Sequence, residues 1–196
     1  DFLREGMGIR LLTASDILAL EQRTEGWVAG LQLAGLSIRS EADPARFIRN
    51  FTGSDRIILD YFMEEVFTRQ PEDVRNFLLA SSLLERFCAP LCDAVLAGLS
   101  DEAAQTKGSQ DLLERLEHAN LFLIPLDDQR QWYRYHHLFA DLLRHALSHV
   151  APQKIPALHR RASQWLEETG FIPEAVRHAF QTGDWDYTAD MVERHA

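Results

Sequence analysis

Apolar residues recur at helical spacing along most of the chain, and this pattern predicts a mainly α-helical protein. The first predicted helix follows the capping run Thr13–Asp16 and begins its apolar face with Ile17, Leu18 and Leu20. The same spacing, interrupted by proline, glycine and acidic starts, predicts more helices before residue 120. These are expected over 25–39, from about 44, and over 56–69, 71–85, 90–97 and 109–119.

The period then changes from helical to alternating. Leu121–Leu126 is a short apolar run, and Trp132–Tyr135 alternates aromatic with charged positions. The polar segment Asp127–Arg130 lies between them, so the two runs predict a β-hairpin. Three helices followed by a hairpin are the element order of a winged helix-turn-helix.

Helical spacing returns after the hairpin. A helix over 136–149 is predicted, and its buried face should comprise Leu138, Phe139, Leu142, Leu143, Ala146 and Leu147. Further helices are expected over 158–169, between Pro173 and Gly183, and from Trp185 onward. Small and large apolar residues alternate in this last part, at Ala162, Trp165, Leu166, Ala175, Ala179, Phe180 and Ala189. Such alternation is typical of helix pairs in a tetratricopeptide-like (TPR-like) array.

Composition narrows the class of protein. The 196 residues carry 20 Lys+Arg and 30 Asp+Glu, a formal net charge of −10, which argues against a polyanion-binding surface over the whole chain. The only cysteines, Cys88 and Cys92, are too few for a disulfide framework or a structural zinc site. We find no signal-peptide pattern and no apolar run long enough to span a membrane, so a cytoplasmic protein without membrane contact is expected.

Motifs for covalent or metal-dependent catalysis are missing from the sequence. No Gly-Lys dipeptide occurs, which excludes a P-loop within this chain, and HExxH, GxSxG and CxxC are also absent. We therefore expect this chain not to be an enzyme and to bind no cofactor by itself.

Direct DNA reading is disfavoured by the predicted recognition helix. The segment from Asp111 to His118 holds three acidic residues and one arginine. Carboxylates at this position would repel the DNA backbone, and a protein-facing role is expected instead.

The richest local cluster is Trp132–Phe139, in which His136 and His137 leave the hairpin and enter a helix. A histidine at a helix start can donate a ring N–H to a phosphate. The alternative is structural, with His136 half-buried and hydrogen-bonded and His137 solvated. A metal hypothesis competes as well, since one helical face carries His137, Asp141, His145 and His149.

Several stretches together resemble the MalT-like, LuxR-type large ATP-binding transcriptional regulators of the STAND class. The matching stretches are Thr24–Ala34, Asp60–Val66, Leu121–Leu126 and Trp132–Leu143. The resemblance implies a helical lid over 1–70, a winged-helix domain over 71–149 and the beginning of a TPR-like region over 150–196. An upstream P-loop domain and a downstream DNA-binding domain would lie outside the chain.

The resemblance also implies candidate nucleotide-sensing residues. Related proteins hold a winged-helix histidine, in a Met-His-Asp-like motif, against the β-phosphate of ADP; Tyr135-His136-His137 resembles that motif, with His136 as the phosphate sensor. Gly26, Trp27 and Val28 resemble the Gly-x-Pro motif that lies beside the adenine in the lid, with valine in place of proline.

The function expected from this resemblance is a regulatory fragment of an ATP-dependent transcriptional regulator. Its lid and winged helix would sense ATP or ADP held by the upstream ATPase domain and relay that state to the downstream repeat and DNA-binding domains. The parent protein would be a slow ATPase, and DNA would be bound only outside this chain. Two alternatives remain: a stand-alone helical protein-interaction module, and a winged-helix protein that binds DNA directly.

Overall fold

The computed structural model describes residues 13–24, 38, 48, 60, 62–97, 108–118 and 122–195. Contacts divide the chain into two compact units, one of Asp1–Arg69 with His136–Leu142 and one of Gln70–Tyr135 with Leu143–Ala196. The predicted helices over 25–39 and from 44, together with Gly26, Trp27 and Val28, fall outside the described residues apart from Ile38 and Ile48. The described residues are mainly helical and include a small two-stranded sheet, as the sequence predicts.

In the first unit, helix α1 (Ala14–Thr24) begins with reciprocal capping. The Asp16 amide donates to Thr13 Oγ1 at 3.2 Å, and the Thr13 amide donates to Asp16 Oδ2 at 2.9 Å. This pairing satisfies amides that have no partner inside the helix, and it confirms the predicted start. At the other end, Thr24 is completely buried and its hydroxyl donates to the Leu20 carbonyl at 2.9 Å.

The helix predicted over 56–69 differs in type over part of its length. Residues Phe62–Phe67 form one turn of π-helix, and the Thr68 amide donates to the Met63 carbonyl five residues earlier, at 3.0 Å. The Thr68 hydroxyl donates to the Glu64 carbonyl at 2.9 Å and occupies an acceptor of that last turn. Apolar spacing does not distinguish this wider turn from an α-helix.

The second unit contains the predicted winged helix. Helices α5 (Glu72–Ser81), α6 (Ala89–Leu96) and α7 (Ser109–His118) precede strands β1 (Leu123–Pro125) and β2 (Tyr133–Tyr135). The strands are antiparallel, with Leu123 opposite Tyr135, and Phe87 exchanges two 2.8 Å backbone hydrogen bonds with Tyr133. Phe77, Phe87 and Leu113 are fully buried in this unit.

Helix α5 ends at Ser81 rather than at the predicted residue 85. The Ser81 and Ser82 hydroxyls donate to carbonyls of the last turn, those of Phe77 and Leu79. The Ser82 carbonyl then accepts from Arg144 Nε at 2.9 Å, and Phe87 joins the sheet. These contacts from distant residues stop the helix, and no local sequence signal announces them.

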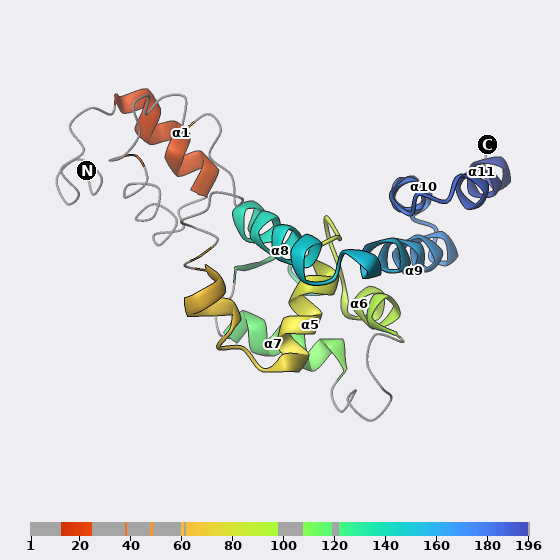
Figure 1. Ribbon diagram of the computed structural model, residues 1–196, viewed down its shortest axis with the longest axis horizontal. Helices are drawn as coiled ribbons and strands as arrows, with labels where there is room; N and C mark the ends of the chain where they lie inside the picture. The colour runs from red at the N-terminus through yellow and green to blue at the C-terminus, as the bar shows by residue number, and fades with distance from the viewer. Residues whose placement is uncertain are drawn as a thin grey trace. The chain divides into compact units, whose positions relative to one another are not determined.

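Helix α8 (His137–Val150) buries the six apolar residues that were predicted for its face. A 3₁₀ turn (Pro152–Lys154) leads to α9 (Ile155–Glu168), α10 (Ile172–Gln181) and α11 (Trp185–Arg194), and α9 packs against both α6 and α10 (Figure 1). Helix α9 begins at Ile155 instead of Leu158, because Pro156 occupies its first turn, where proline is tolerated. The glycines after α9 and α10, Gly170 and Gly183, have φ of +85° and +72° and end these helices as predicted.

Two residues of the small-and-large pattern lie at the surface. Phe180 is 49% exposed and Ala189 is also exposed, whereas Ala162, Leu166, Ala175 and Ala179 are buried as a packed helix pair requires. A TPR-like array therefore stays a prediction for this region. No described helix is both long and apolar enough to cross a bilayer.

Candidate functional site

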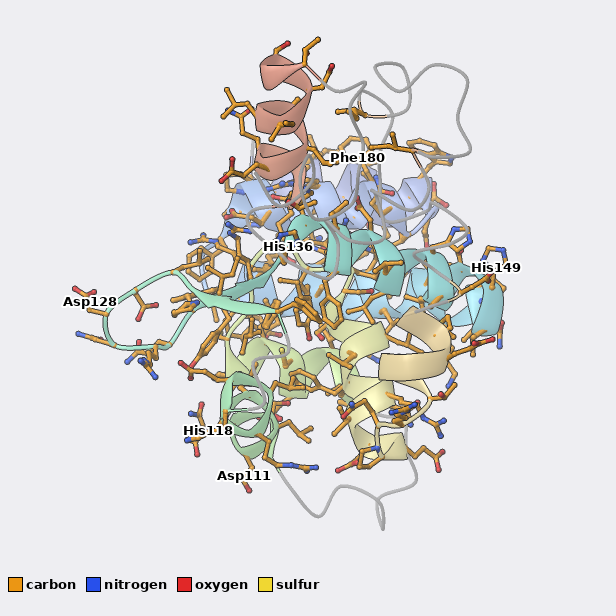
Figure 2. All side chains as sticks on the ribbon, turned by 90° about the vertical axis from the view of Figure 1, so that its left-hand side faces the viewer. Asp111, His118, Asp128, His136, His149 and Phe180 are labelled. Atoms are coloured by element: carbon orange, nitrogen blue, oxygen red, sulfur yellow. The ribbon has the colours of Figure 1, made fainter. Side chains whose placement is uncertain are left out.

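His136 lies between strand β2 and helix α8, and it belongs to the first unit together with α1. Figure 2 shows it at the N-terminal end of α8, with His149 toward the other end. Its side chain is buried, with 5% of the residue exposed. Nε2 lies 2.5 Å from the carbonyl oxygen of Thr24, the last residue of α1.

The second ring nitrogen of His136 caps α8. The Leu138 amide donates to Nδ1 at 3.2 Å, and the His136 carbonyl accepts from the Ala140 amide at 2.9 Å. Both bonds are those of an N-cap residue, a position usually taken by Ser, Thr, Asp or Asn. Because an amide only donates and a carbonyl only accepts, Nδ1 must be the acceptor and Nε2 must carry the hydrogen. His136 is therefore a neutral imidazole with a single donor, directed at α1.

The two neighbours of His136 have different surroundings. The His137 ring stacks on the His136 ring with centroids 4.7 Å apart and planes 19° apart, and it is half-buried. Tyr135 is buried in the second unit, where its hydroxyl is 2.8 Å from Ser81 Oγ and its ring lies 4.7 Å from that of Phe87. Burial raises the pKa of Tyr135 well above its usual value. Tyr135 thus anchors the strand that leads to His136.

We expect Tyr135→Phe to lower the free energy of unfolding by about 1 kcal/mol, because it removes one buried hydrogen bond and keeps the ring. The Ser81 hydroxyl retains its bond to the Phe77 carbonyl, so no donor is left unpaired. Urea denaturation of the full-length protein measures the change. Equal stability of variant and wild type would show that the bond contributes nothing.

Of the two predicted sensing segments, the structure places only one. Gly26, Trp27 and Val28 lie outside the described residues, but they begin two positions after Thr24. The bond between His136 and Thr24 joins the start of α8 to the end of α1.

The four residues considered as metal ligands all lie on α8: His137, Asp141, His145 and His149. Within the described parts of the chain, no three His, Cys, Asp or Glu side chains gather as a metal ion would need. The His145 and His149 rings lie 4.2 Å apart, and His149 Nδ1 lies 2.8 Å from the His145 carbonyl, so it donates to that oxygen.

The predicted recognition helix, with its three acidic residues, is α7. Figure 2 shows Asp111 and His118 at the surface of this helix. Glu117 accepts from the Tyr133 hydroxyl at 3.3 Å and pairs with Arg130 at 2.7 Å. Glu117, one of the three carboxylates, therefore contacts the hairpin instead of facing DNA.

A buried pair, His159 of α9 and His178 of α10, was not foreseen from the sequence. Their Nδ1 atoms lie 2.8 Å apart, so one ring donates and the other accepts. Burial lowers the pKa of both imidazoles to about 4, and for His178 the neighbouring His159 and Arg177 add to this. The only sequence signal is that each histidine falls on the apolar stripe of its helix.

An aromatic cluster around Arg86 was missed as well. The guanidinium lies 4.8 Å from the ring centroid of Trp132 and 5.1 Å from that of Phe171, and it donates to Glu174 at 2.8 Å. The two rings also meet edge to face, with centroids 5.3 Å apart, so this cation–π cluster connects the hairpin of the winged helix to the turn between α9 and α10.

Comparison with known families decides the identity of this arrangement. Residues 63–155 match the family model of the MalT winged helix domain, and they include the three helices, the hairpin and His136. This chain carries a MalT winged helix domain. The MalT-like resemblance seen in the sequence is thereby confirmed.

The similarity to MalT-like proteins extends over nearly the whole chain. It is 38% identical over 192 residues to the serine/threonine-protein kinase PknK of Mycobacterium tuberculosis, which covers 98% of this chain and 16% of that protein. It is 34% identical over 187 residues to the HTH-type transcriptional regulator MalT of Klebsiella pneumoniae, covering 94% of this chain and 20% of that protein. MalT of Yersinia pestis is 33% identical over 187 residues, with the same two coverages. The chain thus spans about a fifth or less of the length of these MalT-like relatives.

Proposed function

We propose that this chain is the regulatory part of an ATP-dependent transcriptional regulator of the MalT and LuxR type. Its lid and winged helix sense the nucleotide held by a P-loop domain elsewhere in the same protein, and they relay that state to downstream repeat and DNA-binding domains. The protein acts in the cytoplasm, and DNA is bound outside this chain.

The relatives support a relay role over catalysis. One is named as a protein kinase and another as a transcriptional regulator, and both share this segment. A segment common to proteins with such different outputs is best explained as a control module whose output domain lies elsewhere. The absence of a Gly-Lys dipeptide is consistent with a chain that is not itself an enzyme.

The observation that carries the proposal is the Nε2–H donor of His136 at the end of α1. A phosphate oxygen accepts a hydrogen bond just as the Thr24 carbonyl does. Among the described residues, this is the one donor that the MalT-like resemblance assigns to phosphate. The described residues would therefore supply a single hydrogen bond to the phosphate, and the P-loop of another domain would supply most of the other donors.

The proposal predicts that His136→Ala in the full-length protein weakens ADP binding. One hydrogen bond to a charged group contributes about 1.5–3 kcal/mol, which is about ten- to a hundredfold in affinity, and the bond that His136 already makes to Thr24 offsets part of it, so the loss should fall at the lower end of this range. Basal transcription should rise at the same time. Calorimetric titration with ADP and a reporter assay measure the two effects. His149→Ala, at an exposed position on the same helix, is the matched control. Wild-type ADP affinity in His136→Ala would remove this residue from nucleotide sensing.

A further inference from the structure

We propose that the Thr24 carbonyl and a nucleotide phosphate compete for the same hydrogen, the one on His136 Nε2. In the structure that hydrogen is bound by Thr24 at 2.5 Å. Binding of a phosphate by His136 would then require release of the C-terminal turn of α1. The inference rests on the proposed function for the phosphate, and on the described residues alone for the contact with α1.

The hydrogen bonds of the ring explain why His136 could not bind Thr24 and a phosphate at the same time. Nδ1 is occupied by the Leu138 amide, so it cannot offer a second donor unless the α8 cap is broken. Protonating Nδ1 would convert this acceptor into a donor facing an N–H group. The ring is also buried and stacked on His137. His136 can therefore exchange one acceptor for another without changing its charge.

The Thr24 carbonyl needs a hydrogen-bond donor from outside its own helix. Its carbonyl is among the last four of α1, which have no partner within the helix, and the residue is completely buried. A buried carbonyl without a donor is unfavourable, so removing His136 from it should loosen the end of the helix.

Two substitutions separate the functions of the two ring nitrogens. His136→Asn places an amide near the position of Nδ1 and keeps an N-cap residue, but it is too short to reach Thr24. His136→Gln carries a donor to the approximate position of Nε2, but it lacks the Nδ1 acceptor. Hydrogen–deuterium exchange of the full-length protein, without nucleotide, reports on the amides of α1.

We expect His136→Asn to increase amide exchange in Leu20–Thr24 about tenfold, and His136→Gln to stay close to wild type in this segment. The α9 peptide, Ile155–Glu168, belongs to the other unit and serves as the internal control. Wild-type exchange of α1 in His136→Asn would overturn the inference, because the bond would not be holding the helix end. Should His136→Asn fail to fold, slow exchange of α1 in His136→Gln supports the contact and fast exchange overturns it.

Addition of ADP to the full-length protein tests the competition itself. Exchange in Leu20–Thr24 should rise on addition of ADP to wild type and stay high, with no further change, in His136→Asn. If ADP affinity falls in His136→Ala but ADP leaves α1 exchange unchanged in wild type, competition is wrong while the proposed function stands. If ADP affinity is independent of His136, the proposed function fails, and the nucleotide-free experiment alone decides the contact with α1.

Discussion

Acidification from pH 7 to pH 4.5 is expected to destabilise the second unit by about 2 kcal/mol for each imidazole of the His159–His178 pair. Both histidines have a pKa of about 4 in the folded protein against an ordinary value of 6.5, because burial disfavours the charged ring. The unfolded chain therefore binds more protons in this range, so stability is fully present above pH 6.5 and is lost as the pH falls toward 4. Near His178, Arg177 lowers its pKa further, while Glu85 and Glu174 oppose the shift.

Urea denaturation at pH 7, 5.5 and 4.5 measures this loss, with the double variant His159→Asn/His178→Asn as the comparison. Asparagine places amide atoms near the Nδ1 positions and does not titrate. The double variant should show a much smaller change of stability with pH over this range, whatever its absolute stability. Four carboxylates with lowered pKa, Asp127, Glu167, Glu174 and Asp184, begin to lose their stabilising contribution as the pH approaches their ordinary values, but both proteins contain them, so this loss is common to the two curves. Parallel curves for the two proteins would exclude the histidine pair as the origin.

Phe77→Ala is expected to cost about 3–5 kcal/mol of unfolding free energy, since it opens a cavity in a fully packed core. Phe77 lies on α5 and has no exposed surface. Phe180→Ala makes the same chemical change on α10 at a side chain that is 49% exposed, and it should cost less than about 1 kcal/mol. Chemical denaturation of both variants provides the comparison. A similar loss in both would mean that Phe180 is covered by something in the full-length protein.

Much of the fold could be predicted because its elements carry local signals. The capping run before α1, the change of period at the hairpin and the glycines after α9 and α10 each act within a few residues. The end of α5 could not be predicted, since the groups that stop it include Arg144, which is 62 residues from Ser82. The apolar stripe of α8 was predictable residue by residue because one face of a buried helix must be apolar.

The site was less accessible to sequence reasoning. The MalT-like resemblance drew attention to His136, but its partner Thr24 is 112 residues away in the chain. Histidine is uncommon as an N-cap, so no sequence pattern indicated that His136 Nδ1 would cap α8. The His159–His178 contact likewise depends on how α9 and α10 pack, and the two residues stand 19 positions apart.

The cation–π cluster around Arg86 has a practical consequence for dividing the protein into fragments. Trp132 and Phe171 both lie near one guanidinium and contact each other edge to face, although a division at residue 149 would assign them to different domains. Truncation after Val150 would strip Arg86 of both Phe171 and Glu174 and leave an indole and a cation facing water. A shortened winged helix for biochemical work should therefore extend through α10, so that this cluster is retained intact.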